Sequence, residues 1–423
     1  MAKLALALTL LLAVSLLSCR GGAKPSPAVE PLLTPTPAAQ ASPTAQAFAC
    51  PKPEELARYW PPQGVVGFRY QDRQIGVDAR DTPFGQVKVL GIACGNLRGR
   101  GQDAYVAYQL PERQPLVPPA GLTLLAALHS AEGSFTNLGI LPFWDRFDSL
   151  KFQDITADDK AEVILMGNVG ASGVPAFSIW HWQEGSYREV FQGRSEHGGP
   201  QFRDVDGDGK PEIIVYATAV YPRVLGIIWP VVYRWDGQSF RPALVPQVYG
   251  DFIAQALLAL REGRLKDLPY SESVLHTHVG HAYQLQGRTA EARAEYERAW
   301  DIYANGALRP QPPCTSAAQG VELFYGSIAM GELPLAYATL GEAYRRAQPF
   351  PDFAAGFART REVQLLEPAK VVGQEGDITL VAVRLRAKDL APQGEVEQRL
   401  AGTWRVRQQG QVCTLERGDI RQE

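Results

Sequence analysis

The chain has no basic block and none of the motifs that mark common catalytic centres. Its 42 basic and 45 acidic residues leave a formal net charge of −3, so it lacks the electrostatic footprint of a nucleic-acid-binding protein. A Gly-x-Ser-x-Gly elbow, a phosphate-binding loop and a His-Glu-x-x-His motif are all absent. With 21% charged and 45% hydrophobic residues among 423, the chain is neither wholly disordered nor wholly embedded in a membrane.

This length, together with 40 glycines and 32 prolines, favours several domains joined by linkers. We predict an all-β repeat domain that forms a small or incomplete propeller, a short α-helical hairpin and a C-terminal α+β cone. The predicted segments are a signal peptide (1–19), a tether (20–49), the β-repeat domain (50–248), the helices (249–306), a linker (307–317) and the α+β domain (318–423).

The N-terminus has the pattern of an export signal. Lys3 precedes an apolar run over 4–17, which is too short for a comfortable bilayer crossing. Leu16-Leu17-Ser18-Cys19 follows and resembles the bacterial lipobox, a resemblance that implies lipidation of the Cys19 thiol. The alternatives are an ordinary signal peptide or an uncleaved short anchor. The sequence thus predicts an exported lipoprotein, anchored by its lipid in a membrane at the bacterial cell surface or on its periplasmic face.

Residues 20–47 contain six prolines and no aromatic residue. Such a composition cannot form a core and favours extended, semi-rigid backbone. We interpret the segment as a tether because it follows Cys19 directly, although a disordered leader would have the same composition.

Four cysteines remain if Cys19 carries lipid, and an even number in an exported chain favours disulfides. Three connectivities are open. Cys50 and Cys94 flank the first folded segment, whereas Cys314 and Cys413 flank the last, so we predict the pairs Cys50–Cys94 and Cys314–Cys413. No Cys-x-x-Cys or Cys/His cluster indicates structural zinc.

An internal repeat lies in the middle of the chain. The segment from Phe152 to Leu165 aligns with that from Phe202 to Val215 at a spacing of 50 residues, and a weaker copy begins at Asn96. Each copy continues into an apolar strand, a turn and another strand, as in blades or stacked sheets. At this period 54–248 allows nearly four units, with 54–88 completing a small or incomplete propeller; an open stack of sheets is the alternative.

The second full copy carries oxygen side chains at alternate positions, the pattern that suits a hard cation. Its predicted ligands are the side chains of Asp204, Asp206, Asp208 and Glu212 and the carbonyl of Lys210. The loop resembles the FG-GAP family of propeller repeats, also known as VCBS-like repeats, which implies a structural Ca²⁺. A solvated acidic turn is the alternative.

The other two copies are poorer cation loops. The copy with Asp154, Thr156, Asp158 and Glu162 lacks one carboxylate and both glycines, so we expect it to bind Ca²⁺ more weakly or not at all. The copy with Arg98 and Arg100 at ligand positions should bind no cation.

A helical period of 3.6 begins after Gly250 and continues from Glu272 to Asn305. The spacing of Gly280, Ala292 and Tyr296 is similar to a tetratricopeptide helix pair, in which small residues let two helices approach. A further cluster, His276, His278 and His281, has no acidic or cysteine partner at ligand spacing, so packing is favoured over metal binding.

The C-terminal segment is predicted as helices over 321–346 and 350–357 followed by strands near 361–366, 378–387, 397–408 and 411–416. This order resembles the nuclear-transport-factor-2-like, or SnoaL-like, cone fold. Strand alternation puts Val381, Val383, Leu385, Trp404 and Val406 on one face. Tyr325, Tyr337 and Asp352 are candidate pocket residues, with core packing as the alternative.

Two functions follow from these patterns. The first is a non-enzymatic binding or scaffold protein of the cell envelope, whose C-terminal cone binds a ligand or an envelope protein or glycan partner, and for which nucleic acid is excluded. The second is an enzyme with a proton-transfer or hydrolytic site in that cone. No pair of residues in the sequence can be nominated as acid and base, so the first is preferred.

Overall fold

The computed structural model describes residues 50–63, 66–70, 73–77, 80, 82–95, 103–109, 123–129, 134–140, 146–169, 173–183, 186–218, 227–306, 313–391 and 394–423. The predicted signal peptide, Cys19, the tether, Arg98 and Arg100 lie outside these residues. Within the described part, helices and antiparallel sheets both occur and no sheet closes into a barrel. No described helix is both long and apolar enough to span a membrane.

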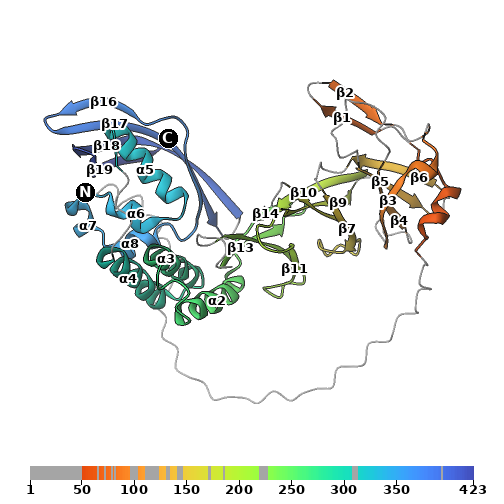
Figure 1. Ribbon diagram of the computed structural model, residues 1–423, viewed down its shortest axis with the longest axis horizontal. Helices are drawn as coiled ribbons and strands as arrows, with labels where there is room; N and C mark the ends of the chain where they lie inside the picture. The colour runs from red at the N-terminus through yellow and green to blue at the C-terminus, as the bar shows by residue number, and fades with distance from the viewer. Residues whose placement is uncertain are drawn as a thin grey trace, which may run out of the picture.

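Three four-stranded antiparallel sheets follow one another along the chain, each with its strands in sequence order. Figure 1 shows them in a row, from the orange sheet through the yellow one to the green one beside the helices. Their strands are β3 (Lys88–Gly95), β4 (Asp103–Gln109), β5 (Thr123–His129) and β6 (Ser134–Ile140); β7 (Arg146–Gln153), β8 (Glu162–Val169), β9 (Val174–Gln183) and β10 (Ser186–Arg194); and β11 (Gln201–Arg203), β12 (Glu212–Thr218), β13 (Ile228–Trp235) and β14 (Phe240–Pro242).

The middle sheet packs on both faces. Val163 and Leu165 of β8 join Tyr105 of the first sheet in one apolar cluster. Ile164, which points the other way, joins Ile213 of the third sheet in another. Because successive strand residues face opposite sides, a strand whose two faces both pack against apolar side chains needs apolar residues at successive positions. This requirement explains the continuous apolar run of β8.

Residues 54–88, which the repeat spacing predicts to complete a small or incomplete propeller, form no four-stranded sheet within their described part. Their described part contains the two-stranded sheet of β1 (Val66–Tyr70) and β2 (Arg73–Val77), and two short 3₁₀ helices, Pro53–Arg58 and Phe84–Gln86. The disulfide between Cys50 and Cys94 connects this segment to β3, as the sequence predicted.

Three helices follow the third sheet: α2 (Tyr249–Arg261), α3 (Pro269–Leu285) and α4 (Thr289–Asn305). Helices α3 and α4 form the predicted hairpin. A Cβ added at Gly280 would lie 2.4 Å from the Tyr296 ring, so only glycine allows this close packing.

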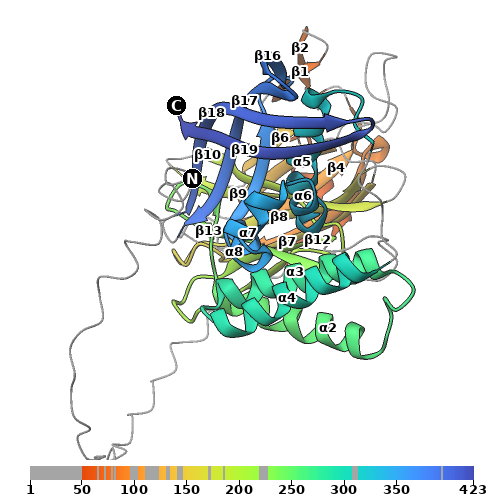
Figure 2. The same ribbon diagram turned by 90° about the vertical axis from the view of Figure 1, so that its left-hand side faces the viewer.

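The C-terminal segment places short helices against a long sheet. The helices are α5 (Ala317–Ala329), α6 (Leu333–Ala338), α7 (Glu342–Ala347) and α8 (Phe350–Ala355), and the strands are β15 (Thr360–Leu365), β16 (Lys370–Glu375), β17 (Ile378–Ala391), β18 (Gly394–Gln409) and β19 (Val412–Gln422). The sheet order is β15-β17-β18-β19, with β16 paired to the other end of β17. Figure 2 shows α5 and α6 against this curved sheet.

The core of this segment contains the five residues that strand alternation assigned to one face, all of which are buried. The disulfide between Cys314 and Cys413 ties the start of α5 to β19, again as predicted. One apolar cluster extends from Val232 of the third sheet through Leu275 of α3 to Trp404 of β18. Packing is therefore continuous from the third sheet to the C-terminus.

Candidate functional site

The loop between β11 and β12 is organised by its own acidic side chains. Asp204 accepts hydrogen bonds from the backbone N–H groups of Gly207 (2.7 Å), Asp208 (3.2 Å) and Gly209 (2.9 Å). Both glycines have left-handed backbone, with φ of 79° and 85°, a conformation that costs glycine almost nothing. The Asp204 carboxylate thus holds a tight bend that the two glycines allow.

Glu212, the first residue of β12, lies on the buried side of this loop. Its side chain is fully buried and accepts hydrogen bonds from the Val205 N–H (2.9 Å) and from Arg234 Nε (3.2 Å). Burial and the charge of Asp206 raise the pKa of Glu212, although the Val205 N–H and Arg234 oppose this rise. Arg234, on β13, also forms an ion pair with Asp206. A guanidinium therefore bridges two carboxylates of the loop.

Three carboxylates of the loop converge on its open side. Asp204, Asp206 and Asp208 each offer an oxygen atom, and these atoms all lie within 4.8 Å of one another. The donor set consists of hard oxygen ligands, which fits Ca²⁺. Glu212, predicted as a further ligand, is instead engaged by Val205 and Arg234.

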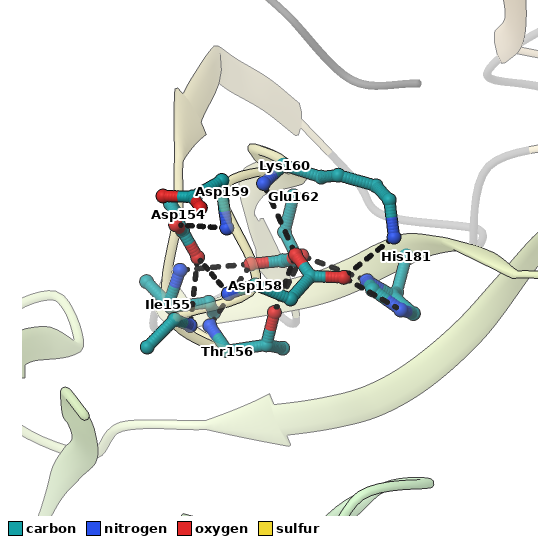
Figure 3. Close-up of polar contacts among 9 residues, drawn as sticks. Asp154, Ile155, Thr156, Asp158, Asp159, Lys160, Glu162 and His181 are labelled. Carbon is teal, nitrogen blue, oxygen red and sulfur yellow. Dashed lines mark hydrogen bonds and ion pairs between the residues drawn. The ribbon is translucent and has the colours of Figure 1, made fainter. Parts of the chain in front are cut away.

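Figure 3 shows the loop between β7 and β8. This loop has left-handed backbone at the same two positions as the other loop, but without the glycines. Asp154 accepts hydrogen bonds from the N–H groups of Ala157 (2.7 Å), Asp158 (3.3 Å) and Asp159 (3.0 Å). Ala157 and Asp159 have φ of 57° and 62°, at the positions that Gly207 and Gly209 occupy in the other loop. The Asp154–Glu162 loop is therefore a true structural copy of the Asp204–Glu212 loop.

Glu162 is fully buried at the back of this copy, and its two oxygens have different partners. Oε2 accepts hydrogen bonds from the N–H groups of Ile155 (2.8 Å) and Thr156 (3.2 Å). Oε1 lies 2.8 Å from Nδ1 of His181 and 3.2 Å from the Thr156 hydroxyl. His181 was not among the residues predicted from the sequence; it is 6% exposed and lies on β9.

The other ring nitrogen of His181 faces Asp158, with 3.9 Å between Nε2 and Oδ2. Asp158 also pairs with Lys160 at 2.8 Å on the exposed side of the loop. Burial alone would raise the pKa of Asp158, but Lys160 and His181 outweigh it and lower that pKa. Asp158, Glu162 and His181 form a second cluster whose ligand atoms lie within 4.8 Å of one another.

The repeat itself contains a signal for His181. His181-Trp182 and Arg234-Trp235 align when the copies are extended to the next strand. Glu162 and His181 lie one position beyond the paired residues Val163 and Trp180. Glu212 and Arg234 likewise lie one position beyond Ile213 and Tyr233. The middle and third sheets thus place a glutamate opposite a basic residue at the same register.

A separate cleft of about 810 Å³ lies where the third sheet, α3 and the C-terminal segment meet. Its wall carries Trp229 of β13, whose ring lies 5.0 Å from that of Tyr249 and 5.5 Å from that of His278. Arg359 and Arg361 also line the cleft, together with Glu332 and Glu362. The cleft therefore combines aromatic surface with charged groups of both signs.

His281 is a titratable group in the lining of this cleft. Burial, together with the neighbouring His278, lowers its pKa to about 3. Its Nε2 lies 3.2 Å from the carbonyl of Ala354, so this nitrogen donates the hydrogen bond. At neutral pH His281 is an uncharged structural group, poorly suited to proton transfer.

None of the three candidate pocket residues lines the cleft. The hydroxyl of Tyr325 accepts a hydrogen bond from Trp404 Nε1 (3.0 Å), and that of Tyr337 donates to the carbonyls of Arg345 and Gln348. Asp352 is exposed and pairs with Arg293. Both tyrosines belong to the packed core, the alternative that the sequence left open.

No family model matches the chain, and no curated protein or solved structure matches it either.

Proposed function

We propose that the protein is a non-enzymatic binding protein of the cell envelope and that the 810 Å³ cleft is its ligand site. The cleft carries this proposal because its volume falls within the range of small-molecule sites. Its lining combines apolar and aromatic side chains with a few polar groups, which is the usual composition of such sites.

The aromatic part of the lining favours a ligand with a planar or apolar body. Trp229 is half-buried and packs edge-on to Phe252, with 4.9 Å between ring centroids. Aromatic side chains of this kind contribute much of the binding energy in pockets while holding a fixed geometry. Tyr249 and Phe357 extend the same apolar surface.

The charged part favours an anionic group on that ligand. Arg361 is paired with Glu395 at 3.1 Å, and Glu362 is paired with Arg386 at 2.6 Å. For Arg359, which is exposed, the described contacts include no ion pair. Its guanidinium therefore remains available to a carboxylate or sulfonate.

The rest of the proposal rests on the sequence. Lipidation at Cys19 would anchor the protein to a membrane, and the Pro-rich tether would hold the folded part away from its surface. The three sheets would be FG-GAP-like repeats in an open array, stabilised by Ca²⁺ at Asp204, Asp206 and Asp208. The helices would be a tetratricopeptide-like hairpin, and the C-terminal segment a nuclear-transport-factor-2-like domain.

The cleft can be tested with 1-anilinonaphthalene-8-sulfonate, an aromatic anion that fits both parts of the lining. Titration of the full-length protein should give one saturable site, detected by probe fluorescence. Trp229→Ala and Arg359→Ala should each weaken binding about tenfold, because each removes one class of contact.

Val371→Ala is the matched control, since Val371 is 57% exposed and lies on β16 outside the cleft. It should leave probe binding unchanged. Non-saturable binding, or equal affinity in all three variants, would contradict a ligand site at the cleft.

A further inference from the structure

We propose that Asp158, Glu162 and His181 form a binding site for a divalent transition metal of the zinc class, in the loop that the sequence predicts to bind Ca²⁺ more weakly or not at all. This inference does not rest on the binding role of the cleft. It follows from the chemistry of one buried carboxylate and from a comparison of two copies of the same loop.

The first observation is the burial of Glu162. Its side chain has no exposed surface, and a buried carboxylate is stable only when it is paired, hydrogen-bonded or bound to a metal. The N–H groups of Ile155 and Thr156 bind Oε2. Oε1 accepts a hydrogen bond from the Thr156 hydroxyl (3.2 Å) and lies 2.8 Å from Nδ1 of His181.

The second observation comes from the other copy of the loop. There Arg234 occupies the register position of His181 and contacts both Asp206 and Glu212. A fixed positive charge therefore lies between the carboxylates of that copy. In the first copy the same register position carries His181, whose imidazole nitrogen can bind a metal ion, as the guanidinium of Arg234 cannot.

The donor set selects the class of metal. Calcium takes six to eight oxygen ligands, whereas this cluster offers one imidazole nitrogen and two carboxylates, with the Thr156 hydroxyl beside them. Imidazole combined with carboxylate suits Zn²⁺ and its neighbours in the first transition row. Lys160 pairs with Asp158 only on the exposed side, and its flexible ammonium can leave when the metal enters.

The backbone contacts of Glu162 also resemble the support that metal ligands require. Two N–H groups fix Oε2 and thereby direct Oε1 toward His181. Such outer contacts orient ligands and raise metal affinity. His181 itself is held against the Trp235 ring, with 5.4 Å between ring centroids.

The test is calorimetric titration of chelator-treated full-length protein with Zn²⁺ alone. Wild type should bind Zn²⁺, and His181→Gln should lower the Zn²⁺ affinity about tenfold or more, since glutamine offers no imidazole nitrogen. Asp158→Asn should lower the Zn²⁺ affinity similarly. Because Asp158 is partly exposed, this variant retains the buried Glu162–His181 pair. It therefore tests the site even if His181→Gln fails to fold. Zinc-edge X-ray absorption should show imidazole coordination, and millimolar Ca²⁺ should not displace the metal.

His197→Gln is the control for adventitious histidine binding, and Asp204→Asn is the control for the other loop. Both should leave this zinc affinity unchanged. The proposal is overturned if wild type binds no Zn²⁺. It is also overturned if His181→Gln and Asp158→Asn bind as tightly as wild type, which would mark the ion as adventitious.

Discussion

The Asp154–Glu162 and Asp204–Glu212 loops share one backbone and differ in the residue that faces their buried glutamate. Both fold around a first aspartate that binds three N–H groups, and both place Glu162 or Glu212 at the start of a strand. His181 faces one glutamate and Arg234 faces the other. The comparison shows that the loop conformation is set by its internal hydrogen bonds, while its chemistry is set by the neighbouring strand.

The ranking of the two loops therefore depends on which cation is considered. The sequence favours the Asp204 loop because it has more carboxylates at ligand positions and two glycines. The structure adds that Arg234 already neutralises part of that charge, whereas His181 adds a nitrogen ligand to the poorer loop. An oxygen count alone describes affinity for hard cations but not for transition metals.

The largest expected effect comes from removal of the buried glutamates. Glu162→Ala should lower the free energy of unfolding by about 3–5 kcal/mol, because it leaves two N–H groups and His181 without their acceptor. Glu212→Ala should cost somewhat less, since fewer loop N–H groups depend on it, although Arg234 loses a partner. Denaturant unfolding at pH 7 measures both.

Glu416→Ala serves as the control for a partly exposed acid, because Glu416 pairs with Arg407 and is 28% exposed. A loss below about 1 kcal/mol is expected there. If Glu162→Ala cost no more than this control, the loop would not depend on its glutamate.

A second prediction concerns His281, a buried histidine that faces His278, the Tyr296 ring and the Ala354 carbonyl. The folded pKa of His281 is about 3, below the unfolded value of about 6.5. The contribution of His281 to the free energy of unfolding is thus fully present above pH 6.5. It falls as pH drops toward 3, because the unfolded state then binds a proton that the folded state does not. The slope is at most about 1.4 kcal/mol per pH unit.

Denaturant unfolding between pH 6.5 and 4.5 should therefore show a loss of about 2–3 kcal/mol in wild type relative to His281→Gln. Glutamine can still donate to Ala354 but does not titrate. Identical pH slopes for the two proteins would mean that another group controls acid sensitivity.

A third prediction concerns Ca²⁺ at the Asp204 loop. Binding should stabilise the protein by about 2.7 kcal/mol when free Ca²⁺ is 100-fold above Kd. Asp208→Asn should remove most of this effect, and Thr156→Ala should remove little. Arg234→Gln should enlarge it, because the guanidinium no longer competes for the carboxylates.

Thermal melting of the full-length protein with Ca²⁺ and with chelator measures this response. Equal melting temperatures at millimolar Ca²⁺ would support the solvated acidic turn instead. If the Ca²⁺ response persisted in Asp208→Asn, the ion would bind at other residues.

The sequence was informative wherever a local pattern determines the outcome. The small residues Gly280 and Ala292 indicated the α3–α4 hairpin, and the positions of the four cysteines indicated both disulfides. Alternation located the buried face of β17 and β18. It could not locate β16, whose residues are almost all exposed, because an exposed edge strand has no apolar period.

The candidate sites were less predictable because they depend on contacts between distant residues. His181 lies 19 residues from Glu162 and reaches it only through the pairing of β8 with β9. The cleft combines residues from the third sheet, α3 and the C-terminal segment, for which no sequence pattern specifies proximity. Tyr325 and Tyr337 were candidates for a pocket within one domain and instead fill its core.

The smallest expected effects concern the backbone that the two loops share. Ala157 has φ of 57°, a conformation that costs a residue with a side chain about 1–2 kcal/mol relative to glycine. Ala157→Gly should therefore stabilise the protein by up to about 1 kcal/mol, after the greater flexibility of glycine in the unfolded chain is deducted. Asp159→Gly should gain less, since aspartate tolerates this conformation better.

The reverse change at Gly207 completes the comparison. A Cβ at Gly207 meets no described atom within 4 Å, so Gly207→Ala should cost only the conformational term, about 1 kcal/mol. Denaturant unfolding in the presence of chelator separates this term from metal binding. If both Ala157→Gly and Gly207→Ala destabilised the protein, the two loops would not share a backbone requirement. Opposite signs of similar size are expected, because the same left-handed position is occupied by alanine in one loop and glycine in the other.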